Sequence, residues 1–179
     1  FDASKVRSGI LYEELGISEK RPIVLFICRL HPQKRPFLML KIAKQVQKKI
    51  KNVAFVVIGD GSQKEELISA TKTMELDNTV YFLGSKNEVR PYYKDTKVTL
   101  ICSIKEGLAL TAYESCAMGV PVVSADVGGQ KDLIDSSVGK LIPFMLDEDK
   151  HFDSRDFSDK EINAYTDAIV EILSDEEKW

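Results

Sequence analysis

The stretch that decides the fold is VTLICSIKEGLALTAYESCAMGVPVV, at residues 98–123. Its apolar run at 98–102 predicts a buried strand, and residues 110–118 predict a helix that stops at Gly119. A further apolar run at 121–124 predicts the next strand. Strand, helix and strand in this succession are typical of parallel strands joined by a helical crossover.

The same alternation continues on both sides of this unit. Further strands are expected at 23–27, 53–58, 79–83 and 140–142. Helices are expected from Pro36 to Ile50, at 63–74 and at 88–95, and a short helix is expected between Gly129 and Ile134. A last helix is expected to carry Ile162, Tyr165, Ile169 and Ile172 on one face. Residues 1–21 are polar and mixed, and we expect a loop in the acid-rich residues 147–161.

The predicted strands are apolar along their whole length rather than at every second residue. That pattern indicates a parallel sheet with both faces covered. Right-handed crossovers then give an α/β, Rossmann-like three-layer fold, which we expect to form a single domain over residues 1–179. In such sheets ligands bind outside the carboxyl ends of the strands, so the loops after the predicted strands are the candidate site.

The composition excludes several classes of protein. With 44% hydrophobic residues the chain has enough apolar content for a core, and its net charge of −3 offers no cationic field for nucleic acid. It lacks an apolar run long enough to span a membrane. The three cysteines and the absence of an export signal favour a cytoplasmic location. Since the first residue is Phe1 rather than Met, we expect processing or a cut before it.

The loop at 28–35, which reads CRLHPQKR, follows the first strand. It contains no glycine, which argues against the dinucleotide-binding motif. Arg29 and Lys34 instead place two cations where they could bind phosphate oxygens. The alternative is that both are ordinary surface cations near a turn. Similarly, Gly59 after the second strand either permits a tight turn or lets a ligand approach the backbone.

The loop after the strand at 98–102 carries two carboxylates, Glu106 and Glu114. If Leu110 and Thr111 open the following helix, their unpaired N–H groups form a phosphate site. Both carboxylates would then suit hydroxyl groups of a ribose or a sugar. The alternative is that Glu106 is a solvated loop residue and Glu114 a favourable charge near a helix N-terminus.

Six motifs in order resemble the carboxyl-terminal domain of the family-4 (group 1) retaining glycosyltransferases of the GT-B fold. They are Arg29-Leu-x-x-x-Lys34, Ile58-Gly-Asp-Gly61, Val80-Tyr-Phe-Leu-Gly84, the E-x7-E element Glu106–Glu114, the run Ser115–Val123, and Gly128-Gly129. The match extends from about Pro22 to Pro143. The chain departs from the family pattern at Cys28, Arg35 and Ala109, where the family has glycine, or glycine or proline at the last.

The resemblance implies a donor site for a UDP- or GDP-sugar. Its expected catalytic groups are Arg29 and Lys34 on the diphosphate and Glu106 on the transferred sugar. Its expected donor-binding residues are Gly59, Gly84, Gly107, Leu108, Ala109, Leu110, Thr111 and Glu114, the last of these on the ribose. It implies no cofactor and no metal. Asp147-Glu148-Asp149, formally an Asp-x-Asp pattern, and the isolated His31 and His151 are not expected to bind a metal ion.

The resemblance further implies transfer of a sugar, with retention, to a polysaccharide or glycolipid acceptor. A preceding domain would bind the acceptor and carry the peripheral membrane association, so this domain alone would have little activity. Two alternatives stay open: a nucleotide-sugar epimerase of the same fold, and a non-catalytic scaffold domain. We expect Tyr92 and Tyr93 to pack on the sheet, the three cysteines to be structural, and the lysines of the helix 36–50 to form a solvated face.

Overall fold

The computed structural model describes residues 3–18, 21–107, 109–145 and 155–175. Its strands are β1 (Ile23–Ile27), β2 (Ala54–Ile58), β3 (Val80–Gly84), β4 (Val98–Ile101), β5 (Val122–Ala125) and β6 (Gly139–Ile142). Its helices are α1 (Ile10–Leu15), α2 (Pro36–Lys49), α3 (Lys64–Thr73), α4 (Arg90–Lys94), α5 (Leu110–Ala117), α6 (Gln130–Leu133) and α7 (Asp159–Ser174), with 3₁₀ turns η1 (Ala3–Lys5) and η2 (Pro32–Lys34).

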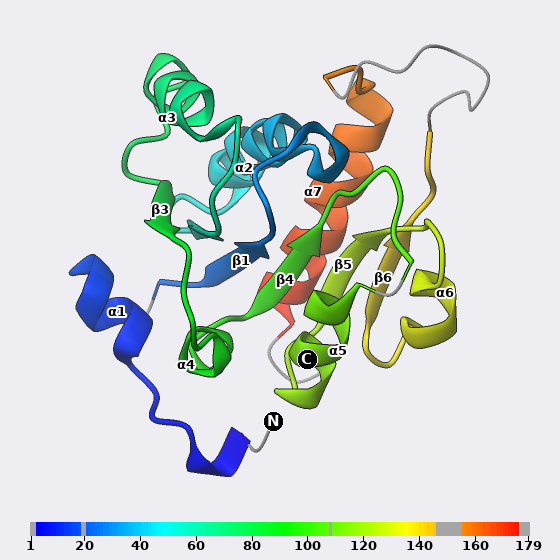
Figure 1. Ribbon diagram of the computed structural model, residues 1–179. Coiled ribbons are helices and arrows are strands. Elements are labelled where there is room, and N and C mark those ends of the chain that lie inside the picture. Colours follow the sequence, from blue (N-terminus) through cyan, green and yellow to red (C-terminus); the bar gives the residue numbers. More distant parts are fainter. Residues whose placement is uncertain (1–2, 19–20, 108, 146–154, 176–179) are drawn as a thin grey trace.

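All six strands are parallel and lie in the order β3-β2-β1-β4-β5-β6 (Figure 1). This is the strand order of Rossmann folds, and it confirms the predicted fold class. The chain order reverses between β1 and β4, which pair directly through Val24 with Val98 and Leu25 with Thr99. The loops that leave these two strands therefore diverge, and they leave space above the carboxyl end of the sheet.

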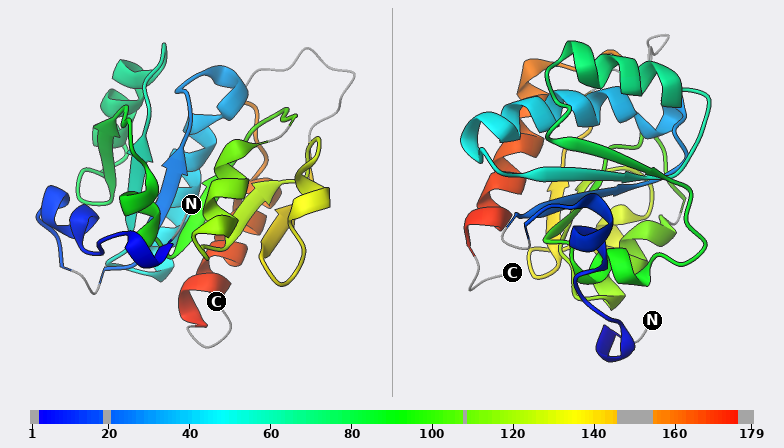
Figure 2. Two further views of the ribbon diagram at one scale, coloured as in Figure 1. Left: turned by 60° about the horizontal axis from the view of Figure 1, so that its bottom comes forward. Right: turned by 90° about the vertical axis from the view of Figure 1, so that its left-hand side faces the viewer.

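Helices cover both faces of the sheet and make three layers (Figure 2). One face packs against α2, α3 and α7 in a core that includes Phe26, Phe55 and Tyr165. The other face packs against α1 and α4 near Leu25, and against α5 near Val122. The first four residues of β1 and all of β2 are buried, as expected for strands that are apolar along their length.

The polar, mixed segment 1–21, to which the sequence analysis assigned no element, contains η1 and α1. Helix α1 is too short for a periodic signal, and its amino-terminal cap comes from far along the chain. The carboxylate of Asp95 accepts hydrogen bonds from the N–H groups of Gly9 at 2.6 Å and Leu11 at 2.8 Å. The buried Leu11 then anchors the helix on the sheet.

The prediction of a loop over residues 147–161 is wrong at its carboxyl-terminal end, because α7 begins at Asp159. The local sequence holds a capping box, in which the Ser158 hydroxyl accepts a hydrogen bond from the N–H of Glu161 at 3.1 Å. Glu161 is buried and pairs with the buried Arg35, so its acidic character does not report solvent exposure. The expected Asp147-Glu148-Asp149 and His151 lie outside the described residues.

Candidate functional site

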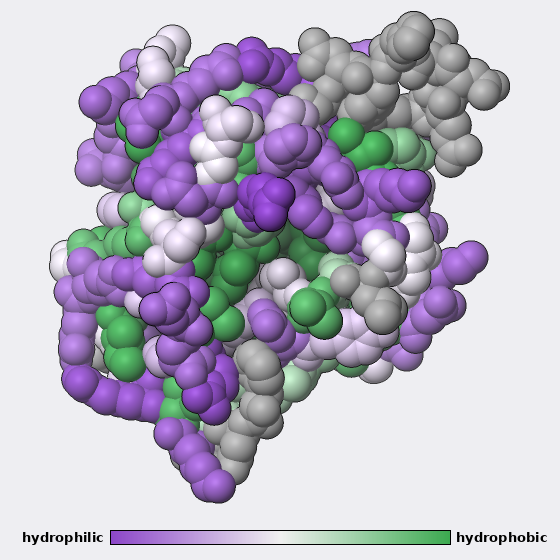
Figure 3. Space-filling view, viewed as in Figure 1, coloured by the Kyte–Doolittle hydropathy of each residue, from purple (hydrophilic) through white to green (hydrophobic). Residues whose placement is uncertain are grey.

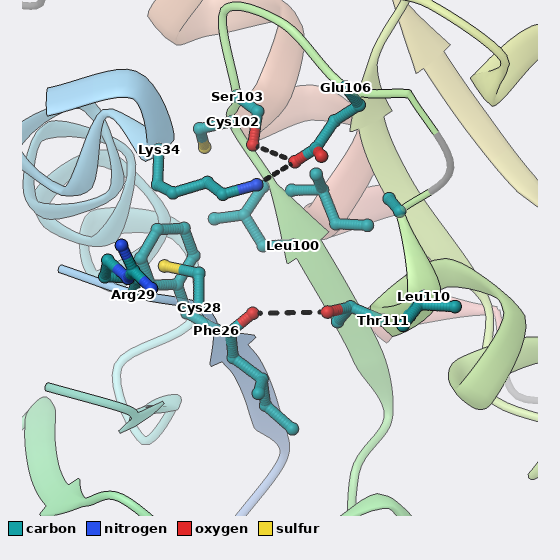
Figure 4. Close-up of a pocket in the computed structure, with 13 residues that line it drawn as sticks. Phe26, Cys28, Arg29, Lys34, Leu100, Cys102, Ser103, Glu106, Leu110 and Thr111 are labelled. Carbon is teal, nitrogen blue, oxygen red and sulfur yellow. Dashed lines mark hydrogen bonds and ion pairs between the residues drawn. The ribbon is translucent and has the colours of Figure 1, made fainter. Parts of the chain in front are cut away.

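A cavity of about 280 Å³ lies where the loops after β1 and β4 diverge (Figure 4). Phe26 and Leu100, from these two strands, are among its lining residues. Its rim includes six of the predicted site residues: Arg29, Lys34, Glu106, Ala109, Leu110 and Thr111. Figure 3, in the view of Figure 1, shows apolar surface in a central hollow with hydrophilic residues around it. The fold therefore brings together loops that are about 70 residues apart in the sequence.

Lys34 and Glu106 meet across this cavity. The Lys34 ammonium lies 2.5 Å from Glu106 Oε1, and the Ser103 hydroxyl donates to the same oxygen at 2.5 Å (Figure 4). Both charged side chains are largely buried, with 25% of Lys34 and 10% of Glu106 exposed. A cation and a carboxylate thus stand side by side in a partly desolvated site. Sequence reasoning did not single out Ser103, although its position just after the strand was a usable signal.

Arg29 supplies a second cation at the same edge of the sheet. It is exposed, it lines the cavity, and its guanidinium has no hydrogen bond or ion pair to another residue in the described part of the chain. Its five donors therefore remain available to an anion. Arg29 also lines a neighbouring cavity of about 290 Å³, which includes Gly59, Ser85 and Lys86. The two cavities share Ile27, Cys28 and Arg29.

Helix α5 begins at Leu110, as predicted, and its amino terminus opens on the cavity. Ala109 precedes the helix, and its carbonyl accepts the N–H of Ala112 at 2.8 Å. The N–H groups of Leu110 and Thr111 belong to the first turn, where a helix offers them no acceptor. The Thr111 hydroxyl reaches the Ile27 carbonyl at 3.4 Å and ties this helix end to β1. The leucine side chain at 110 is 70% exposed.

Glu114 lies one turn further along α5 and does not line the cavity. Its carboxylate accepts a hydrogen bond from the Tyr93 hydroxyl at 3.1 Å, and the same hydroxyl lies 3.3 Å from the Thr111 carbonyl. Burial and the nearby Glu114 charge raise the pKa of Tyr93, so this hydroxyl stays a donor. The sequence predicted only that Tyr93 packs on the sheet. Packing is confirmed, but a buried tyrosine also needs a polar partner, and that signal was missed.

Gly59 and Gly84 hold the loops after β2 and β3 together. The N–H of Gly59 donates to the Gly84 carbonyl at 2.9 Å. Gly59 has a φ of +132°, and a Cβ at this position would lie 1.9 Å from the Cys28 carbonyl oxygen. Only glycine permits this approach of β2 to the loop after β1. Gly59 lines the neighbouring cavity, whereas Gly84 lines neither cavity.

The loop that carries Glu106 is supported from below by Gly128. A Cβ at Gly128 would lie 1.8 Å from the Glu106 carbonyl oxygen, and the N–H of Gly129 donates to the Gly107 carbonyl at 3.3 Å. The predicted site residue Gly107 is exposed and does not line the cavity. The predicted site residue Leu108 lies outside the described residues. Gly128 and Gly129 therefore pack directly against the backbone of the loop that carries Glu106 and help to fix its position.

Cys28 and His31 both belong to the loop that follows β1. Burial raises the pKa of the Cys28 thiol to about 12, so it is uncharged at neutral pH. His31 is exposed, and its Nδ1 accepts the N–H of Gln33 at 3.4 Å. Among the described residues no cluster of three or more histidine, cysteine, aspartate or glutamate side chains could hold a metal ion. None of the helices in the described ranges is long and apolar enough to cross a membrane.

Two cations, a helix amino terminus and a carboxylate converge on one cavity at the switch point of a Rossmann sheet. The family model described as "Glycosyl transferases group 1" matches residues 10–178. The chain belongs to the group 1 glycosyltransferases. It is 37% identical over 127 residues to a PP-undecaprenol alpha-1,4-N-acetyl-D-galactosaminyltransferase of Campylobacter jejuni, an alignment that covers 69% of this chain and 35% of the relative.

Two further comparisons extend over more of the chain. A UDP-Gal:alpha-D-GlcNAc-diphosphoundecaprenol alpha-1,3-galactosyltransferase of Escherichia coli is 25% identical over 176 residues, which cover 96% of this chain and 44% of that protein. The crystal structure of S. aureus TarM with UDP superposes with a TM-score of 0.73 at 26% identity, over 87% of this chain and 29% of that one. The chain thus spans less than half the length of these relatives.

Proposed function

We propose that this group 1 glycosyltransferase chain binds the nucleotide-sugar donor, and that the cavity between the loops after β1 and β4 is the donor's diphosphate and sugar site. The observation that carries the proposal is the convergence of Arg29, Lys34 and the amino terminus of α5 on that cavity. All three features attract negative charge, and the site has room for a diphosphate.

The Lys34–Glu106 pair supplies the two functions that sugar transfer needs. In glycosyl transfer the bond between the anomeric carbon and the diphosphate breaks, and the leaving diphosphate gains negative charge. Lys34, Arg29 and the α5 N–H groups would stabilise that charge in a partly desolvated site without a metal ion. Glu106, beside Lys34, is placed to accept hydrogen bonds from hydroxyls of the sugar.

The nucleoside would extend from the diphosphate along the edge of the sheet. Glu114, held by Tyr93, lies one helical turn beyond Thr111 and would accept bonds from the ribose hydroxyls. The neighbouring cavity, lined by Gly59, Ser85 and Lys86, would take the base. UDP in the TarM structure and UDP-Gal in the name of the E. coli relative support a nucleoside diphosphate as this group.

The whole protein is then a retaining hexosyltransferase in which a preceding domain contributes the acceptor site. The two curated relatives are about twice the length of this chain, which leaves room for such a domain. Both curated relatives name undecaprenol-linked saccharides, so a lipid-linked glycan is the proposed acceptor class. A cytoplasmic protein at the inner face of a membrane fits that acceptor. The chain described here would bind donor but transfer little sugar by itself.

A calorimetric titration of the chain with UDP, GDP and ADP tests the donor site. We expect one nucleotide to bind best, and we expect Lys34→Ala to weaken its binding by about tenfold or more, because a charge-assisted phosphate contact is lost. Lys41→Ala is the matched control, since Lys41 is an exposed lysine on the helix that follows the same loop. Binding of none of the three, by this chain and by the longer protein alike, would reject the donor site and favour a scaffold role.

A further inference from the structure

The residue after Lys34 has no role in the proposed chemistry, yet it is the largest fully buried side chain in the described part of the molecule. Arg35 is 0% exposed, and its backbone has a φ of +51°, a left-handed conformation that is unfavourable for any residue other than glycine. A buried charge and a strained backbone both cost free energy. The structure must therefore hold Arg35 in place through strong contacts.

Those contacts come from Glu161 on α7 and from residues that precede this helix. Arg35 Nη1 donates to Glu161 Oε1 at 2.6 Å and Nη2 donates to Glu161 Oε2 at 2.8 Å, a two-pronged pair. Nη2 also donates to the carbonyl of Asp156 at 3.0 Å. The guanidinium carbon lies 5.9 Å from the ring centres of Phe144 and Phe157. Glu161 is itself 1% exposed and is fixed by the Ser158 cap of α7.

The backbone of Arg35 connects this anchor to the loop that carries Lys34. Its N–H donates to the Pro32 carbonyl at 2.9 Å and closes η2, and its carbonyl accepts the N–H of Leu38 at 3.0 Å at the start of α2. The same turn is tied on its other side to the Glu106 loop, where Gln33 Nε2 donates to the Lys105 carbonyl at 2.9 Å. Lys34 thus lies between two anchored neighbours: Gln33, which is bonded to the loop after β4, and Arg35, which is bonded to α7.

We propose that the Arg35–Glu161 pair is a positioning device for Lys34, through which α7 sets the place of the phosphate-binding ammonium group; this rests on the proposed donor site. The pair joins residues that are 126 positions apart, and one of its members, Arg35, directly follows Lys34 in the chain. Exposed pairs at the protein surface can move without shifting a loop, whereas a buried, two-pronged pair permits only one geometry.

The test separates positioning from stability by replacing both partners at once. Removing one partner would strand a buried charge and unfold the chain, so single variants are uninformative. The double variant R35M/E161L keeps similar side-chain volumes and leaves an apolar core in place of the buried ion pair. Such replacements of buried ion pairs leave stability about unchanged or higher. The matched control is K49M/D167L, which removes an exposed pair, at 2.6 Å, between the same helices α2 and α7.

The readout is the ratio of affinities for the best-binding nucleoside diphosphate and for its parent nucleoside. Lys34 acts on the phosphates only, so its displacement lowers this ratio, whereas general loosening of the fold weakens both ligands together. We expect R35M/E161L to lower the ratio by about tenfold, towards the value of Lys34→Ala, with the melting temperature retained. We expect K49M/D167L to leave the ratio unchanged. A stable R35M/E161L variant with the wild-type ratio would overturn the positioning role.

Amide hydrogen exchange tests whether the Arg35–Glu161 pair holds the Lys34 turn in place without relying on nucleotide binding. The N–H groups of Lys34 and Arg35 are bonded to the carbonyls of His31 and Pro32, each at 2.9 Å. We expect both to exchange about tenfold faster in R35M/E161L than in the wild type, because the anchored turn opens locally. If no nucleotide binds even the wild type, the donor site fails, and unchanged protection of these two amides would separately reject the anchor.

Discussion

The ammonium nitrogen of Lys34 and the Oε1 atom of Glu106 lie 2.5 Å apart, although 72 residues separate them in the chain. The group that is to bind phosphate is therefore already paired with a carboxylate in the free protein. The phosphates of a nucleoside diphosphate that enters the cavity are attracted by the positive charge of Lys34. They are also repelled by the negative charge of Glu106, which lies at a similar distance. The affinity for the nucleoside diphosphate without its sugar therefore reflects both the attraction by Lys34 and the repulsion by Glu106.

Glu106→Gln is expected to tighten the binding of the nucleoside diphosphate by about threefold or more, because it removes the repulsion and keeps the side-chain shape. Sugar transfer by the longer protein should fall, since the amide accepts hydrogen bonds less strongly than the carboxylate. Titration calorimetry measures the first effect and a donor-consumption assay the second. Glu75→Gln, which neutralises an exposed carboxylate paired at 3.5 Å with Lys44, is the control. Weaker nucleotide binding by Glu106→Gln would contradict the balance described.

Tyr93→Phe should weaken nucleotide binding by about three- to tenfold, because Glu114 loses the hydroxyl that holds it at 3.1 Å. The fold should lose about 1 kcal/mol, measured by urea unfolding. Tyr92→Phe is the neighbouring control, since the Tyr92 hydroxyl donates to Glu14 at 3.0 Å, away from the ribose position. Comparison of UDP with its dideoxyribose analogue locates the effect. If Tyr93→Phe weakens both ligands equally, the hydroxyl does not act through the ribose contact.

Gly59→Ala and Gly84→Ala should differ sharply in stability although both glycines have a positive φ. At Gly59 the new methyl group would meet the Cys28 carbonyl at 1.9 Å, so we expect a loss of more than about 3 kcal/mol or a failure to fold. At Gly84, with a φ of +68°, no heavy atom lies within 4 Å, so the loss should be only the conformational cost of about 1–2 kcal/mol. Urea unfolding gives both values. Equal losses would show that the β1 loop can yield.

The Cys28 thiol should make the folded protein lose stability in alkali. Burial raises its pKa from 9.0 to about 12, so the folded state keeps a proton that the unfolded state releases. Its contribution is complete below pH 9 and falls by about 1.4 kcal/mol for each pH unit above that, up to about pH 12. Urea unfolding at pH 8.5 and 10.5 should therefore show a loss smaller by about 2 kcal/mol in Cys28→Ser than in the wild type. Equal losses in the two proteins would place the thiol in contact with solvent.

The continuous apolar runs at 23–27, 53–58 and 98–102 were sufficient to predict a covered parallel sheet, since only strands buried on both faces are apolar throughout. The sequence also predicted at which edge of the sheet the candidate cavity lies, because in such a sheet every loop after a strand opens on the same edge. Arg29, Lys34, Glu106 and the start of α5 could be assigned to that edge from their positions alone.

Tertiary structure decided the features that depend on partners far along the chain. Helix α1 is capped by Asp95, Tyr93 orients Glu114, and Arg35 is buried against Glu161; no local pattern announces any of these contacts. The spacing of apolar residues along a segment predicts which of its faces packs against the core. A hydrogen bond or ion pair between distant side chains requires the whole fold, because both partners must already be in place before either contact exists.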